Sequence, residues 1–227
     1  MSVTAVIPAR MGSQRLKKKN LRELAGIPLI VRAIRRCKAA GVFDEIWVNS
    51  EHRDFEEIAH DEGVQFHHRP EALGSNTATS EQFIAEFLQQ HECTWMVHVH
   101  GIAPLVPVSD VASFVEPLHV DDLDVLLSCE AVQIECAMDG RPVNFSFEEK
   151  TNSQDLTPVQ RITWSLAAWR RETFLRAHAD GHCATWSGRV DYQALHPLAC
   201  HVIKTELDLQ VAEALLPLVE QASGPTC

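Results

Sequence analysis

Short apolar runs alternate with amphipathic segments along most of this sequence, and that alternation constrains the fold more than any other feature. The runs at 3–7 and 95–99 have the length and composition of buried parallel strands. Residues 28–40 place apolar side chains at helical spacing opposite arginines, and Gly41 is expected to end that helix. Strands that alternate with helices predict a doubly wound α/β protein with a mostly parallel sheet.

The other predicted elements continue the same alternation. Further strands are expected at 46–48, 64–66, 125–129, 164–169 and 201–203. Further helices are expected at 55–62, 80–90, 108–118 and 172–179, with Thr79 or Ser80 as the cap of the second. A last helix begins near Thr205, and its residues expected to face the core are Val211, Ala212, Ala214 and Leu215. Residues 224–227 are expected to fray.

Residues 130–161 interrupt this pattern. The stretch is polar, contains Gly140, Pro142 and Pro158, and shows no alternation of helix and strand. A structureless loop of that length is uncommon inside a compact domain. We therefore expect residues 1–227 to form one domain with an arm at 130–161 that packs on another surface.

Composition narrows the choice of partners and compartment. The 227 residues carry a formal net charge of −11, which argues against a nucleic-acid or anionic-membrane partner. Seven cysteines without a CxxC pair fit free thiols better than disulfides or a zinc site. No apolar run approaches the ~20 residues of a membrane span, and no signal peptide precedes the first strand. These features predict a cytoplasmic protein.

A basic loop, residues 8–20, follows the first predicted strand and carries the strongest functional signal. Gly12 lets the backbone approach a ligand, and successive N–H groups of such a turn can cradle an anion. Arg10, Arg15 and Lys19 add full charges suited to phosphate oxygens. The loop matches neither the Walker pattern GxxxxGK[ST] nor the dinucleotide pattern GxGxxG. By charge alone, a solvated basic face is an equally good interpretation.

This loop resembles the signature segment of the cytidylyltransferases that activate acidic sugars, namely the acylneuraminate enzymes (CMP-sialic acid synthetases) and their Kdo relatives. Arg10, Gly12, Ser13, Lys19 and Asn20 match the acylneuraminate pattern, whereas Arg15 with Leu16 is closer to the Kdo branch. Segments that extend the resemblance lie at 68–70, 74–80, 154–156, 170–172 and 203–209. The resemblance implies a nucleotide-diphospho-sugar-transferase-like three-layer α/β sandwich, with a mostly parallel sheet and a dimerisation arm.

The resemblance also implies a reaction, in which CTP and an acidic, nonulosonate-like sugar give a CMP-sugar and pyrophosphate. Arg10 and Lys19 would contact the triphosphate and carry catalysis. The implied nucleotide-binding residues are Ala9, Gly12, Ser13, Arg15, Asn20, Arg69, Thr77 and Thr79. The implied substrate-binding residues are His100, Gln154, Arg161 and Lys204. In the implied homodimer, Lys150 and Arg161 would reach the sugar bound to the other subunit.

The sequence departs from the family at the metal end and at the sugar end. Where the family has two carboxylates that hold Mg²⁺, this chain has Val202 and Lys204, so Mg²⁺ is expected but its ligands are unknown. The family's sugar-facing Gln is His100 here. Its "NGAIY" strand becomes residues 163–167, with Trp164 in place of the glycine.

Several alternatives stay open. Asp208 is either a metal ligand or, with Thr205, part of a Thr-x-x-Asp helix cap. Asp122 and Asp124 either replace the missing carboxylates or lie in a solvated turn. His100 either forms hydrogen bonds in a pocket or binds a metal ion together with His98, because the two side chains lie on the same face of one strand. The chain is the enzyme described above, a non-catalytic CTP- or CMP-sugar-binding homologue, or a nucleotidyltransferase for a neutral sugar phosphate.

Overall fold

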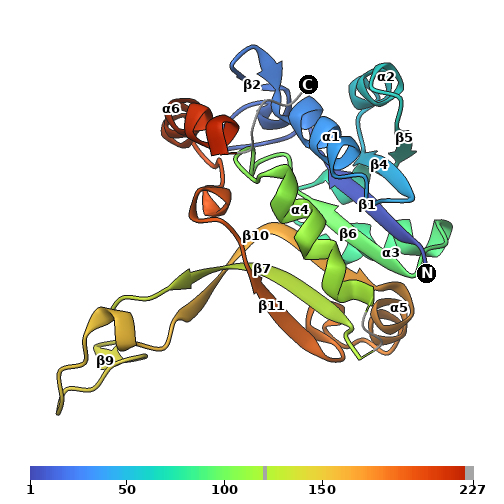
Figure 1. The fold of residues 1–227 in the computed structure, drawn as a ribbon. Coiled ribbons are helices and arrows are strands. Elements are labelled where there is room, and N and C mark those ends of the chain that lie inside the picture. Colours follow the sequence, from blue (N-terminus) through green and yellow to red (C-terminus); the bar gives the residue numbers. More distant parts are fainter. Residues whose placement is uncertain (120–121, 223–227) are drawn as a thin grey trace.

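The computed structural model describes residues 1–119 and 122–222, in which a seven-stranded sheet lies between two layers of helices (Figure 1). The strand order is β11-β7-β10-β6-β1-β4-β5. The strands are β1 (Val3–Pro8), β4 (Glu45–Ser50), β5 (Gln65–His68), β6 (Trp95–Val99), β7 (Val125–Val132), β10 (Val159–Arg170) and β11 (Val190–Ala194). Only β10 runs antiparallel to its neighbours, β6 and β7. The predicted three-layer α/β fold with a mostly parallel sheet is confirmed.

Two groups of helices pack on the two faces of the sheet. One face carries α1 (Leu29–Ala40), α2 (Asp54–Asp61) and α4 (Val108–Val115), and the other carries α3 (Ser80–Gln90) and α5 (Arg171–Ala179). Ile7 and Phe114 are fully buried in the first core, and Phe87 is fully buried in the second. Burial of each such side chain contributes about 1.5–3 kcal/mol. The remaining predicted strands and helices exist with shifted ends, apart from the corrections given below.

The last helix, α6 (Glu206–Ala222), covers a third apolar cluster beside the loop that follows β1. Its buried side chains are Leu209, Ala212, Leu216 and Val219. The prediction that Val211 and Ala214 face the core was wrong, since both are exposed. Relative to the prediction, the helix turns the face with Leu209, Leu216 and Val219 toward the core, because that face buries more apolar surface than the predicted one.

The stretch 201–203 is not a strand, which corrects the prediction. Ile203 is buried and its N–H donates to the carbonyl of Ile102 at 2.8 Å, but the segment joins no strand of the sheet. The seventh strand is β11, parallel to β7 at the edge. Its sequence VDYQA alternates apolar and polar residues, as expected of a half-buried edge strand.

Shorter elements complete the described chain. Two small antiparallel pairs are β2 (Glu23–Leu24) with β3 (Ile27–Pro28) and β8 (Ala137–Met138) with β9 (Arg141–Pro142). The 3-10 helices are η1 (Lys19–Leu21), η2 (Glu71–Gly74), η3 (Glu116–His119), η4 (Ser153–Asp155), η5 (Ala184–Trp186) and η6 (Pro197–Cys200). No helix within residues 1–119 and 122–222 has the length and apolar character needed to cross a membrane. The tail at 224–227 lies outside the described residues.

An arm leaves the sheet where β7 and β10 extend beyond their neighbours, and it projects away from the helices in Figure 1. The ladder between these strands continues from Glu130 paired with Arg161 to Val132 paired with Val159. The outer part of the arm holds β8 and β9. Its exposed apolar side chains are Ile134, Met138, Val143 and Phe147. Several exposed apolar side chains on one projecting segment suit a contact surface.

The strand β10 is irregular where the arm joins the sheet. Its register against β7 shifts between Ile162 and Ala167. Within this irregularity Trp164 has a φ of 60°, in the left-handed region that bulky residues rarely adopt. The following carbonyl, of Ser165, accepts a hydrogen bond from the N–H of His100 at 3.2 Å. The irregularity therefore lies directly beside the carboxyl end of β6.

Candidate functional site

The loop after β1 forms one wall of a cavity of about 310 Å³, which we call the loop cleft. Arg10, Arg15 and Lys19 line it from the loop, and Arg69, Phe83 and His100 line it from the sheet and α3. The cleft lies beyond the carboxyl ends of β1 and β6, where open α/β sheets bind their ligands. The structure thus brings together eight predicted site residues: Ala9, Arg10, Ser13, Arg15, Lys19, Asn20, Arg69 and His100.

Two basic side chains of the loop, those of Arg10 and Lys19, are held by neutral groups. Arg10 donates from Nη1 to Asn76 Oδ1 at 3.1 Å, and Lys19 donates from Nζ to the carbonyl of Ile203 at 3.1 Å. Burial, assisted by the charges of Arg15 and Arg10, lowers the pKa of Lys19 to about 8. A bound anion would offset that repulsion, so the cleft favours an anionic ligand.

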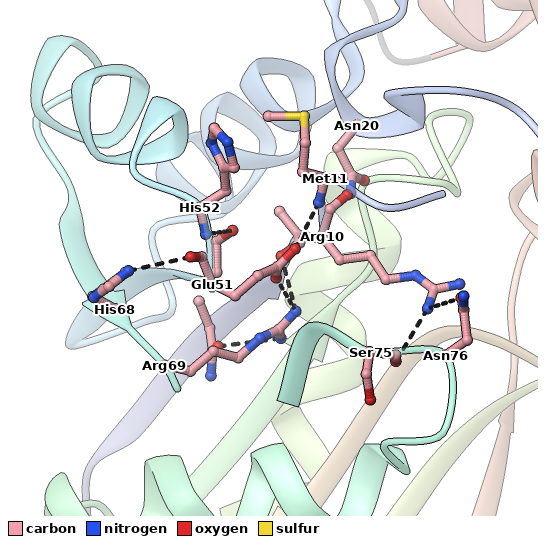
Figure 2. A network of polar contacts seen from close by, with 12 residues as sticks. Arg10, Met11, Asn20, Glu51, His52, His68, Arg69, Ser75 and Asn76 are labelled. Atoms are coloured by element: carbon pink, nitrogen blue, oxygen red, sulfur yellow. Dashed lines mark hydrogen bonds and ion pairs between the residues drawn. The ribbon is translucent and has the colours of Figure 1, made fainter. Parts of the chain in front are cut away.

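A buried ion pair supports the loop from below (Figure 2). Arg69 is buried and donates from Nη2 to Glu51 Oε2 at 2.8 Å and to the carbonyl of Ala9 at 3.1 Å. The other carboxylate oxygen, Glu51 Oε1, accepts from the N–H of Met11 at 2.8 Å. A Cβ on Gly74 would lie 2.4 Å from Glu51 Cγ, so only glycine permits this approach. Glu51 and Arg69 together fix the backbone of the loop on both sides of Arg10.

Sequence reasoning gave Glu51 no role and did not single out Phe83 as a site residue. Phe83 lines the loop cleft, and the guanidinium of Arg69 lies 4.8 Å from the centre of its ring. The sequence signals for Glu51 were its position directly after β4, at the carboxyl edge of the sheet, and its place where the family resembled often has Asp. Its partner is 18 residues further along the chain, so the pair is visible only in the fold.

His98 is buried within β6, and the partly buried His100 directly follows that strand and lines the loop cleft. The ring of His98 stacks on Phe83 at 5.7 Å and meets His100 edge-on at 5.2 Å. Burial lowers the pKa of His98 well below its ordinary value, and burial with the charge of Lys19 lowers the pKa of His100 to about 4. Both rings are therefore neutral near pH 7, and His100 can act as a hydrogen-bonding group in the cleft.

These histidines give stability a defined pH dependence. His91, His98 and His100 each have a pKa lowered chiefly by burial, so below about 6.5 the unfolded chain binds more protons than the folded chain. The free energy of unfolding is expected to be highest above pH 6.5 and to fall as the pH falls toward 5. Urea unfolding at several pH values measures this. His100→Gln should flatten the slope, and equal stability at pH 5 and 7.5 in the wild type would contradict the prediction.

The other predicted site residues lie outside the loop cleft. Gly12 lines a neighbouring cavity with Glu51 and His68. The hydroxyl of Thr79 accepts from the N–H of Gln82 at 3.4 Å in a capping box that begins α3. The Thr77 hydroxyl lies 3.1 Å from that of Ser75.

The predicted substrate residues of the arm and of the C-terminal segment are also outside the lining of the loop cleft. On the arm, the carbonyl of Gln154 accepts from Gln133 Nε2 at 2.9 Å. Arg161 pairs with Glu130, and Lys150 pairs with Glu135. Lys204 is exposed and directly follows Ile203, whose carbonyl holds Lys19.

The residues around the loop cleft do not fit a divalent cation held by carboxylates. Among residues 1–119 and 122–222, no group of three or more His, Cys, Asp or Glu side chains is placed to hold a metal ion. Asp208 Oδ2 accepts from the N–H groups of Lys204 and Thr205 and from the Thr205 hydroxyl, which confirms the helix cap. Asp124 precedes β7 and so lies at the amino ends of the parallel strands, opposite the cleft. It therefore does not replace the missing carboxylates.

The same edge holds the other candidate, Asp122, which pairs with Arg189. Asp124 accepts from the Thr173 hydroxyl at 2.6 Å and from the N–H of Arg189 at 2.9 Å. Both carboxylates therefore serve local structure rather than the cleft.

Comparison with known proteins agrees with this geometry. The profile of a family described as cytidylyltransferase matches residues 4–194. N-acylneuraminate cytidylyltransferase A of Danio rerio is 29% identical over 224 residues, which cover 93% of this chain and 50% of that protein. The 3-deoxy-manno-octulosonate cytidylyltransferase of Acidobacterium capsulatum is 28% identical over 157 residues, covering 64% of this chain and 62% of that protein.

A solved structure shares the fold. CMP:2-keto-3-deoxy-manno-octonic acid synthetase, solved in complex with CTP, aligns with a TM-score of 0.72 at 18% identity and covers 96% of this chain and 99% of that chain. The present chain spans about half the length of the Danio rerio relative. At these identities the solved structure establishes the nucleotidyltransferase-like α/β fold alone.

Proposed function

The chain belongs to the cytidylyltransferase family, and from that premise we propose that it transfers the CMP group of CTP to an acidic sugar and releases pyrophosphate. The observation that carries this proposal is the loop cleft, in which Arg10, Arg15 and Lys19 converge at the carboxyl edge of the sheet. The acidic-sugar class is supported by the relatives, which are named for N-acylneuraminate and 3-deoxy-manno-octulosonate.

In this reaction a hydroxyl oxygen of the sugar attacks the α-phosphorus and gives up its proton to solvent, the bond to the bridging oxygen breaks, and pyrophosphate leaves. Arg10 and Lys19 would balance the charge of the departing phosphates, which is the main service a protein gives to phosphoryl transfer. Ala9, Ser13, Arg15 and Asn20 would bind the nucleotide from the same loop. Asn20 suits this role, because its side chain is buried and its Oδ1 has no partner among the described residues.

The remaining roles extend the same proposal. Gly12, Arg69, Thr77 and Thr79 would shape the nucleotide site, and His100 would bind the sugar. Arg69 acts through the loop, since its guanidinium is already held by Glu51 and Ala9. The Mg²⁺ expected from the resemblance has no carboxylate set in the cleft, so no step of the reaction is assigned to it.

The arm supports a second part of the proposal, a homodimer of one-domain subunits. Its exposed apolar side chains, Ile134, Met138, Val143 and Phe147, suit a protein contact. The side chains of Gln154, Lys150 and Arg161 would then contact the sugar bound to the partner subunit. The proposed enzyme is cytoplasmic. Light scattering at micromolar concentration should give the mass of a dimer, and the mass of a monomer would overturn this part.

A non-catalytic homologue that binds CTP is favoured by one observation, the replacement of the metal-holding carboxylates by Val202 and Lys204. Pyrophosphate release from CTP with a panel of acidic sugars distinguishes the two functions. Release that depends on the sugar supports the enzyme. CTP binding by calorimetry without release from any sugar supports the homologue, and absence of both overturns the proposal.

A further inference from the structure

The loop cleft carries an excess of positive charge. Its lining includes Arg10, Arg15, Lys19 and Arg69 and, within the described residues, no carboxylate. The charge of Arg69 is neutralised by Glu51 at 2.8 Å. Arg10 and Lys19 are held by an amide oxygen and a carbonyl, and the ion pairs of the described chain include neither of them.

A further cation lies beside the cleft. Lys19 Nζ contacts the carbonyl of Ile203, and the next residue is Lys204, which is exposed. Burial and then the charges of Arg15 and Arg10 lower the pKa of Lys19, the charge of Asp208 raises it, and Lys204 adds a smaller lowering contribution. Because Lys204 directly follows the residue whose carbonyl holds Lys19, its charge lies next to the cleft and adds to the positive potential there.

The nearest carboxylate on this segment is already engaged. Asp208 Oδ2 accepts hydrogen bonds of 2.9 Å from the N–H of Lys204, 2.7 Å from the N–H of Thr205 and 2.9 Å from the Thr205 hydroxyl. These contacts lower the pKa of Asp208 and hold its side chain at the start of α6. If Asp208 Oδ2 coordinated a metal ion, it would lose these hydrogen bonds and the helix cap would break. The segment therefore offers no set of metal ligands, because its carboxylate serves as the cap and Lys204 is a cation.

We infer that the loop cleft binds the triphosphate as the free anion, with Lys204 at its margin adding to the positive potential. The inference rests on the proposed binding of CTP and goes beyond it by naming the ionic form of the ligand. A divalent ion brought between Lys19, Lys204 and the phosphates would be repelled by both ammonium groups. It would also cancel two of the negative charges that the cleft is built to attract.

Calorimetric titration of CTP into the full chain at pH 7, with EDTA or with excess Mg²⁺ at matched ionic strength, tests this inference. We expect binding in EDTA and an affinity that is several-fold weaker with Mg²⁺. Binding that is tenfold or more tighter with Mg²⁺ overturns the inference alone. No binding in either buffer overturns both the inference and the proposed function.

Substitutions assign the effect to Lys204. Lys204→Asp should weaken CTP binding in EDTA at least tenfold, and the double change Val202→Asp with Lys204→Asp should make binding depend on Mg²⁺. The matched control is Lys17→Asp, which makes the same charge change at an exposed position of the loop outside the cleft lining. We expect that control to alter affinity less than threefold. An equal loss in both single variants would show a general charge effect and overturn the role of Lys204.

Discussion

Replacing Glu51 with alanine is expected to lower the free energy of unfolding by about 3–5 kcal/mol. The side chains of Glu51 and Arg69 retain only 10% and 3% of their exposure, so the variant leaves a buried guanidinium without its counter-charge. The same carboxylate accepts from the N–H of Met11, which the variant also leaves without that acceptor. Urea unfolding followed by tryptophan fluorescence measures the loss.

The control for this variant is Glu57→Ala, on the exposed face of α2. A surface substitution of this kind changes stability by less than about 0.5 kcal/mol. A loss below about 1 kcal/mol in Glu51→Ala would contradict the prediction. In that case the carbonyl of Ala9 and the amide of Asn49, which also accept from Arg69, would suffice to hold the guanidinium.

Replacing Lys19 or Arg10 with alanine is expected to weaken CTP binding more than tenfold while the fold is kept. A hydrogen bond to a charged group contributes about 1.5–3 kcal/mol, which corresponds to a factor of roughly 10–150 in affinity. Lys19 should show the larger effect, because burial has removed part of the water around its ammonium, as its pKa of about 8 reflects, and a bound phosphate would take the place of that water. Calorimetry gives the affinity, and thermal melting monitors the fold.

Lys17→Ala is the matched control, since Lys17 belongs to the same loop and does not line the cleft. Its affinity for CTP should stay within a factor of about three. Unchanged affinity in both Lys19→Ala and Arg10→Ala would remove the loop from the nucleotide site.

Local chemistry explains what could be predicted from the sequence. The buried strands β1 and β6 are short apolar runs, and the caps at Thr79 and at Thr205 with Asp208 are side chains that bond backbone a few residues away. Such features need no knowledge of distant parts of the chain. The basic loop belongs to the same class, because the charges that line its cleft are neighbours in sequence.

Long-range pairing explains what could not be predicted. The strand β11 exists because β7 offers it an edge, whereas in residues 201–203 Ile203 alone is buried, against the loop and α6, and the segment has no strand partner. Glu51 acquires its role from Arg69, and the effect of Lys204 depends on Lys19, 185 positions earlier in the numbering. These relations arise from the tertiary fold rather than from any local pattern.

The position of β10 between β6 and β7 has a consequence for synthesis of the chain. A ribosome releases β1, β4, β5 and β6 first, and these four strands are already neighbours in the final order. The free edge of β6 is apolar and stays unpaired until the whole arm has been made and β10 returns beside it. Open strand edges of that kind invite association with other chains. During synthesis, β6, whose carboxyl end later borders the loop cleft, is therefore the strand most prone to aggregate with other chains.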